Sequence, residues 1–265
     1  MVSALKETIA GYLKNRVAVA GFASVDRFSE APEKHHPQNV CKNAKTVIVF
    51  GIPVPRGVLD SPDYNLYGLH RTYHTVYRQL DTISLDLCNF LEAQGKHRAI
   101  MVPSYAPMVF SGAEPWGLLS LKHAAVFAGL GAFGRSGQVY HPEYGGRLRL
   151  AAVVTDAEIP GDPVITEDPC PPKCHACQKA CPPAAFTPDG AFQKMVCMGH
   201  TIKHAIYPIA LKGPDALKHI ERVINAAGHD YWLDCDECVK ACANNRCKKS
   251  IKCAFNASWT CLKVL

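Results

Sequence analysis

The chain lacks the features that would place it in or beyond a membrane. It has no run of about 18 apolar residues, the length that a helix needs to cross a bilayer. Lys6, Lys14 and Arg16 interrupt its first residues, no small-residue cleavage site follows them, and no twin arginine is present. We therefore expect a cytoplasmic protein with no membrane partner.

The chain also lacks a strong charge of one sign, internal repeats and low-complexity tracts. Its formal net charge is +6 over 265 residues, and the charges are spread along the sequence. Such a balance permits a nucleic-acid partner without indicating one. With 48% hydrophobic residues, the composition is that of a globular protein with a buried core.

Strand and helix patterns alternate in the first part of the chain. TVIVFGIPV (46–54) is a β-branched run bounded by Gly and Pro, and 98–104 and 147–156 are further strand patterns. Apolar residues recur with helical spacing near the N-terminus and over 73–94 and 118–130. We expect an α+β fold with α/β layers over residues 1–160. A Pro- and Asp-rich connector then leads into a second unit, residues 161–265.

Cysteine is abundant but unevenly distributed. Of the thirteen cysteines, only Cys41 and Cys88 precede residue 170. In a reducing compartment this number argues against a disulfide framework. A zinc site and iron–sulfur clusters are the remaining explanations.

Two cysteine runs resemble those of bacterial ferredoxins. The first is C-x3-C-x2-C-x3-C-P and the second is C-x2-C-x3-C. In ferredoxins, closely spaced thiolates hold one cluster, and the cysteine after the x3 gap ligates the other. The spacing predicts two [4Fe–4S] clusters, the first held by Cys170, Cys174, Cys177 and Cys242. The ligands of the second would be Cys181, Cys235, Cys238 and the lone cysteine between the runs, Cys197.

The spacing leaves alternatives open. The first gap of the first run is x3 where ferredoxins have x2. This difference leaves open whether Cys170 is a ligand. Two C-x2-C pairs can also form an all-cysteine zinc site, although zinc needs only four thiolates and eight are in ferredoxin order. We expect Cys247, Cys253 and Cys261 to be buried free thiols, with a third metal site as the alternative.

Residues 119–156 resemble the signature of the cobalamin-dependent iron–sulfur reductases, a family that comprises epoxyqueuosine reductases and reductive dehalogenases. The similar stretches are AGLG (128–131), GR (134–135), HPEYG (141–145), RLRL (147–150) and VTD (154–156). The helix and strand patterns before them and the cysteine plan are similar too. The resemblance extends over residues 45–245.

The resemblance implies a nitroreductase-like domain that holds a base-off corrinoid, followed by a ferredoxin-like domain with two [4Fe–4S] clusters. In this family the nearer cluster reduces cobalt, and the reduced cobalt carries out the reaction. FMN, which nitroreductase-like domains elsewhere hold, is the less favoured cofactor. Carried over, the residues that line the cofactor are Gly129, Gly131, Gly134, Arg135, His141, Glu143, Tyr144, Gly145 and Arg147. For the glycines, a helix end and tight turn without a cofactor is the alternative.

Two residues are candidate proton donors. The similar epoxyqueuosine reductases keep an acid in a V-D-x-x-P stretch before the AGLG turn, and the corresponding segment here, VFSGAEPWGLL (109–119), has Glu114 as its only acid. Tyr105 is the second candidate. Because the family's usual acid is missing, an electron-transfer protein that reduces a corrinoid or flavin on a partner is the alternative to a reductase.

Many epoxyqueuosine reductases continue into helical repeats that help bind tRNA, whereas this chain ends soon after the second cysteine run. We therefore do not expect tRNA as a partner. We expect a small-molecule substrate or a corrinoid protein, and an external ferredoxin or flavodoxin as electron donor. Electrons would pass through the second cluster and then the first cluster to cobalt.

Overall fold

The computed structural model describes residues 2–61, 66–94, 97–105, 108–111, 114–201 and 235–243. These residues form a mixed α/β structure around a four-stranded antiparallel sheet in the order β1-β2-β8-β3. The strands are β1 (Val19–Ser24), β2 (Thr46–Pro53), β8 (Leu148–Thr155) and β3 (Ala99–Val102). The two central strands, β2 and β8, pair along their whole length.

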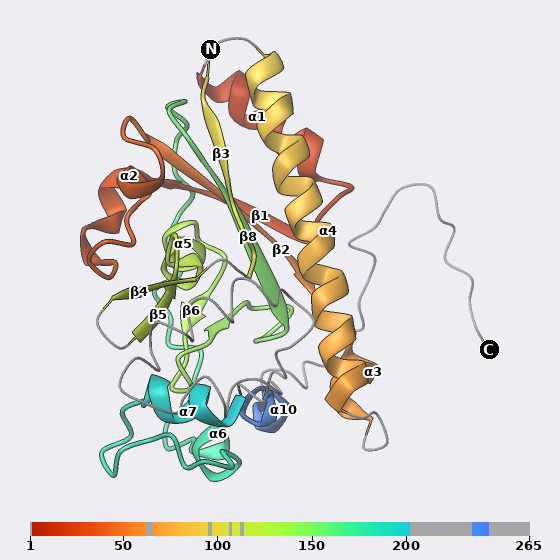
Figure 1. The fold of residues 1–265 in the computed structure, drawn as a ribbon, viewed down its shortest axis with the longest axis vertical. Helices are drawn as coiled ribbons and strands as arrows, with labels where there is room; N and C mark the ends of the chain where they lie inside the picture. The colour runs from red at the N-terminus through yellow and green to blue at the C-terminus, as the bar shows by residue number, and fades with distance from the viewer. Residues whose placement is uncertain are drawn as a thin grey trace, which may run out of the picture.

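Helices cover both faces of this sheet (Figure 1). α1 (Val2–Leu13) and the long α4 (Leu66–Ala93) pack on one face. η1 (Val25–Glu30), α2 (Pro37–Val40) and α5 (Leu121–Phe127) lie on the other, while α3 (Arg56–Asp60) contacts α4. The expected α+β layered fold is therefore confirmed, with antiparallel strands.

The alternation of side chains along β2 explains the two layers. Ile48 and Phe50 pack into the core with α1 and α4, whereas Val47 and Val49 pack into the core with α5. All four are fully buried. Successive strand residues point to opposite faces, so a strand buried on both faces is apolar at every position. This is why the run TVIVFGIPV indicates a buried strand.

The boundaries of the helices differ from the sequence expectation. α4 begins at Leu66, not near residue 73, because helical apolar spacing extends into the preceding residues. α5 ends at Phe127, and Gly129 then turns the chain with a φ of 71°. The N-terminal helix packs Ile9 and Leu13 into the core, as its spacing predicts. None of the helices in the described part of the chain is long and apolar enough to span a bilayer.

Smaller elements surround one end of the sheet. β4 (Met108–Ser111) pairs with β5 (Glu114–Gly117), and β6 (Ala132–Phe133) pairs with β7 (Val139–Tyr140). Three short helices carry cysteines of the two expected cluster sets: α6 (Ala176–Lys179), α7 (Lys194–Thr201) and α10 (Glu237–Ala241). They lie together at the end of the sheet farthest from the N-terminus (Figure 1).

The connector between the two parts of the chain runs beside β1. Asp162 and Phe22 exchange two hydrogen bonds, of 2.8 Å and 2.9 Å, and Lys6 forms an ion pair of 2.6 Å with the Asp162 carboxylate. These contacts fix where the cysteine-bearing segment leaves the sheet. The domain boundary near residue 160 stays a prediction.

Candidate cofactor cavity and cysteine sets

A cavity of about 1010 Å³ lies between the sheet and the cysteine-bearing segment. Its walls come from β5, α5, β7, β8 and α7, and from Cys235 and Asp236 just before α10. The volume is at the upper end of the range for small-molecule and cofactor sites, about 300–1,000 Å³. The cavity therefore has room for a large organic cofactor.

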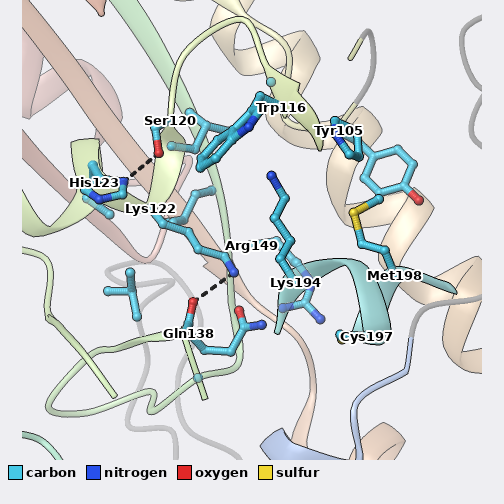
Figure 2. Close-up of a pocket in the computed structure, with 18 of the residues that line it drawn as sticks. Tyr105, Trp116, Ser120, Lys122, His123, Gln138, Arg149, Lys194, Cys197 and Met198 are labelled. Atoms are coloured by element: carbon cyan, nitrogen blue, oxygen red, sulfur yellow. Dashed lines mark hydrogen bonds between the residues drawn. The ribbon is translucent and has the colours of Figure 1, made fainter. Parts of the chain in front are cut away.

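Much of the cavity wall is apolar. Phe133, Met195 and Val196 are among the most exposed large hydrophobic side chains of the described residues, and all three line this cavity. The Trp116 indole forms another part of the wall (Figure 2). Apolar surface gathered in a concave site marks a ligand-binding groove more often than a solvated surface.

Three cationic side chains also line the cavity: Lys122, Arg149 and Lys194. Figure 2 shows Lys194 extending toward Trp116, and its Nζ lies 3.4 Å from the ring centroid. Lys122 donates a hydrogen bond of 2.9 Å to the carbonyl of Gly137. Lys122 is exposed to the cavity, and the protein atoms around the cavity partly desolvate its ammonium group. This desolvation lowers its pKa to about 8; Cys238, when ionised, opposes the shift, and the charge of Arg149 adds to it.

Arg149 connects the sheet to the second cysteine run. Its Nη2 lies 3.1 Å from Oδ1 of Asp236, and its guanidinium carbon lies 3.9 Å from the ring centroid of Tyr73 in α4. Both charged side chains are largely buried, at 13% and 6% exposure. The pair therefore joins β8, α4 and the segment before α10 at the cavity wall.

Candidate proton-transfer groups lie at the same cavity. Tyr105 lines it and stacks on Tyr77, with ring centroids 4.9 Å apart. Ser120 Oγ and His123 Nδ1 are 2.7 Å apart, and both residues line the cavity. Burial lowers the pKa of His123, and the charge of Lys122 lowers it further, so its neutral form is favoured.

Glu114 is the first residue of β5, paired in register with Ser111. Its side chain lies outside the described part of the structure. The next residues, Pro115 and Trp116, line the cavity. The proposed roles of Glu114 and Tyr105 as proton donors stay predictions.

The four cysteines expected to hold the first cluster surround a small, separate cavity of about 20 Å³. Its lining includes Cys170, Cys174, Cys177 and Cys242. Arg135 fixes this loop: its backbone N–H donates to Cys170 Sγ at 3.3 Å, and its guanidinium donates to the Cys174 carbonyl at 2.6 Å. The structure thus brings together residues from both ends of the cysteine-bearing segment.

The cysteines expected to hold the second cluster influence one another. Burial raises the pKa of Cys238 to about 12, and the charges of Asp236, Cys197 and Cys235 add to this rise. Burial also raises the pKa of Cys197, with a further contribution from Cys181. Two of the four, Cys197 and Cys235, line the large cavity. Thiols with raised pKa values are protonated at neutral pH, so metal binding would have to release their protons.

Among the described residues, no group of three or more His, Cys, Asp or Glu side chains is arranged to hold a single metal ion. The assignment of the eight cysteines to two clusters stays a prediction. Cys247, Cys253 and Cys261 lie outside the described residues.

None of the nine residues expected to line the cofactor is among the described residues that line the large cavity, and Arg135 lines the small cavity instead. The lining of the large cavity contains their neighbours: Leu130, Phe133, Gly137, Gln138, Val139, Gly146 and Leu148. Several of the nine have visible structural roles. A Cβ on Gly131 would lie 2.5 Å from the carbonyl oxygen of Tyr140, and one on Gly134 would lie 2.5 Å from the Tyr140 ring. Their direct contact with a cofactor stays a prediction.

The polar members of this group also stabilise turns. His141 Nδ1 accepts hydrogen bonds from the backbone N–H groups of Glu143, at 3.0 Å, and Tyr144, at 3.3 Å. Gly145 has a φ of 60°, and its backbone exchanges two hydrogen bonds with that of His141. Arg147 is buried and donates to the carbonyl of Val54 at 2.9 Å.

Comparison with known proteins identifies similar sequences. No family model matches the chain. The epoxyqueuosine reductase of Bacillus subtilis (strain 168) is 28% identical over 200 residues, which cover 70% of this chain and 47% of that protein. The epoxyqueuosine reductase of Lactococcus garvieae (strain Lg2) is 26% identical over 190 residues, which cover 68% of this chain and 50% of that protein. The chain thus spans about half the length of these curated relatives.

Solved structures share the fold. An epoxyqueuosine reductase in complex with an epoxyqueuosine-modified tRNA-Tyr stem loop superposes with a TM-score of 0.63 at 23% identity, over 94% of this chain and 68% of that chain. A catabolic reductive dehalogenase in complex with 3-bromo-4-hydroxybenzoic acid gives a TM-score of 0.51 at 17% identity, over 68% of this chain and 25% of that chain. The resemblance to the family of epoxyqueuosine reductases and reductive dehalogenases is therefore confirmed.

The comparison corrects one expectation. The exclusion of tRNA as a partner is wrong, because the similar epoxyqueuosine reductase was crystallised with its modified tRNA stem loop. That exclusion rested on where the chain ends, whereas the fold shared with the tRNA-bound enzyme extends over nearly the whole chain.

The sequence interpretation places the first cluster next to the cofactor, whereas two cysteines of the second set, Cys197 and Cys235, line the large cavity. The expected order of electron transfer stays a prediction.

Proposed function

We propose that this chain is a reductase of the epoxyqueuosine reductase type, in which two [4Fe–4S] clusters pass electrons to a corrinoid held in the large cavity. The observation that carries the proposal is the position of Cys197 and Cys235 in the wall of that cavity. A redox cluster held by these cysteines would border the cofactor site directly. Electrons would then enter through the first cysteine set and reach the cavity through the second.

The residues present fit both groups. Cys170, Cys174, Cys177 and Cys242 surround one small cavity, which suits a shared cluster. The apolar wall and the volume of the large cavity suit a bulky cofactor. When bound, a corrinoid would supply the strongly reducing cobalt centre that side chains lack. FMN, with a flat ring and a phosphate, is the second cofactor that this cavity suits.

The chain's own residues would bind the cofactor and exclude water. Trp116, Phe133 and Met195 would cover apolar parts of the ligand. Lys122 and Lys194 would bind anionic groups, since both side chains border the cavity. Tyr105, at the cavity wall, and Glu114, beside it in sequence, are the candidate acids for the protons that a reduction consumes.

We propose tRNA carrying a modified nucleoside as the substrate. The support is the similar enzyme bound to an epoxyqueuosine-modified tRNA stem loop. The cations at the cavity and the net charge of +6 are compatible with a phosphate-rich partner. A cavity in this chain also favours a resident cofactor over reduction of a corrinoid on another protein.

The direct test of substrate is turnover. Reconstituted protein with cobalamin and a chemical reductant would be incubated without oxygen with an epoxyqueuosine-modified stem loop, and the nucleosides would be measured by mass spectrometry. We expect loss of the epoxide oxygen in the parent. Tyr105→Phe and Glu114→Gln should identify the acid by lowering turnover about 10²–10⁴-fold. Protein that binds clusters and cobalamin but leaves the stem loop unchanged would contradict the substrate assignment.

A further inference from the structure

A buried carboxylate next to the second cysteine set is turned away from the helix that it begins. Asp236 occupies the N-cap position of α10, where an aspartate usually accepts a hydrogen bond from a backbone N–H of the first turn. Its side chain makes no such capping bond. Instead its Oδ1 accepts a hydrogen bond of 3.1 Å from Nη2 of Arg149. Asp236 is only 5% exposed, so the pair forms inside the protein.

Arg149, the other member of this ion pair, is held in place by the sheet and by an aromatic ring. It lies in β8, paired in register with Ile52 of the neighbouring strand. Its guanidinium carbon lies 3.9 Å from the ring centroid of Tyr73, a cation–π contact that further restricts the side chain. A guanidinium does not lose its proton in proteins. The structure therefore fixes a permanent positive charge in a largely buried position.

The ion pair borders the second cysteine set. Asp236 lies between Cys235 and Cys238 in sequence, and its carboxylate is 6% exposed where it pairs with Arg149. Arg149, Asp236, Cys197 and Cys235 all line the same cavity. Figure 2 labels both Arg149 and Cys197 among the residues of this wall.

We propose that the Arg149–Asp236 pair sets the reduction potential of the cluster held by Cys181, Cys197, Cys235 and Cys238. The inference rests on the proposed function only in requiring that this cluster exists. On reduction the cluster accepts one electron from an external reductant and becomes more negative, with no other bond made or broken. A nearby cation stabilises the reduced form, and a nearby carboxylate destabilises it. Burial strengthens both effects, because the surroundings screen charges less than water does.

The first cysteine set has a different arginine. Arg135 donates its backbone N–H to Cys170 and its guanidinium to the Cys174 carbonyl. Changes at Arg149 or Asp236 should therefore move one cluster potential and leave the other near its parental value. This selectivity separates local electrostatics from a general loosening of the protein.

The test is an anaerobic redox titration of the iron-reconstituted full chain, followed by electron paramagnetic resonance. Arg149→Met should lower one of the two potentials, and Asp236→Asn should raise the same one. Arg149→Lys keeps the charge and should restore most of the parental value. Lys45→Met is the matched control, because it removes a cation from an exposed ion pair, with Glu158 at 3.2 Å, at the opposite end of the sheet.

Opposite shifts of one potential would support the proposal. Unchanged potentials, shifts in the same direction, or equal shifts of both clusters would overturn it. If Arg149→Met does not retain iron, Asp236→Asn decides, since it preserves size and removes only the charge. A parent chain without two clusters would end both this inference and the proposed function, whereas unchanged potentials in a two-cluster protein would end this inference alone.

Discussion

Lys194 in α7 lies with its Nζ 3.4 Å from the ring centroid of Trp116 in β5, so the cysteine-bearing segment contacts the β4–β5 hairpin across the cavity. The Trp116 indole also stacks on His35, with ring centroids 5.1 Å apart. These two contacts hold one wall of the cavity against another. A cation–π contact shielded from solvent contributes about 2 kcal/mol.

Lys194→Met should therefore weaken corrinoid binding by about tenfold, the equivalent of about 1.4 kcal/mol. The physical reason is that Trp116, which forms part of the cavity wall, loses its cation–π contact with Lys194. Lys194→Arg keeps the cation and should bind nearly as the parent does. Binding is measured by anaerobic titration with cobalamin, and Lys173→Met on the exposed cysteine loop is the control. Equal affinity in Lys194→Met and the parent would show that the contact does not shape the site.

Gly131→Val should destabilise the protein and displace the β6–β7 hairpin. A Cβ at this position would lie 2.5 Å from the Tyr140 carbonyl oxygen, closer than atoms can pack. The expected loss in the free energy of unfolding is about 1–3 kcal/mol, measured by urea denaturation. Gly11→Ala is the control, because nothing lies within 4 Å of its added Cβ, and it should raise the stability of α1. A Gly131→Val protein as stable as the parent would contradict the packing described for this turn.

Lys122 should make the stability of the chain depend on pH in alkaline solution. Desolvation beside the cavity lowers its pKa to about 8 in the folded state, against 10.5 for an ordinary lysine. Between these values the unfolded chain binds more protons than the folded chain, so the free energy of unfolding should rise with pH in this window. The Lys122→Met variant should lack this rise. Urea denaturation of both proteins at several pH values measures it, and parallel pH profiles would contradict a desolvated Lys122.

Cys238→Ala should lose about half of the bound iron, because it removes one ligand of the second set while the first set stays intact. The same change at Cys88 should leave the iron content unchanged, since Cys88 is buried in the core that α4 forms with the sheet. Iron is measured by a colorimetric assay after anaerobic reconstitution. If Cys238→Ala retains the full iron content, Cys238 is not a cluster ligand.

Part of this arrangement could be predicted from the sequence. The ferredoxin-like gaps alone group Cys170, Cys174, Cys177 and Cys242, and the structure places all four around one small cavity. Local spacing brings Cys170, Cys174 and Cys177 together, because closely spaced ligands must lie close together in space. Cys242, in the second run, is grouped with them by the crossed ligation of ferredoxins. The apolar run of β2 is equally informative, because both of its faces are buried.

The walls of the large cavity could not be predicted in the same way. Arg149 and Asp236 are 87 residues apart in sequence, and no local pattern indicates that they pair. Lys194 and Trp116 meet only because α7 packs against the β4–β5 hairpin. The glycines of the AGLG turn are conspicuous in the sequence, but the structure shows close packing around them and places their neighbours in the wall. Sequence motifs thus indicate which part of the chain forms the site, but not which side chains line the cavity.

We propose above that this chain joins two iron–sulfur clusters to a corrinoid site. The most direct measurement is the anaerobic visible spectrum and metal content of the reconstituted chain, with and without cobalamin. We predict about eight irons per chain, one cobalamin retained through gel filtration, and a cobalt spectrum that changes when the clusters are reduced. Stoichiometric zinc with negligible iron, or two clusters with no retained cobalamin, would contradict the account.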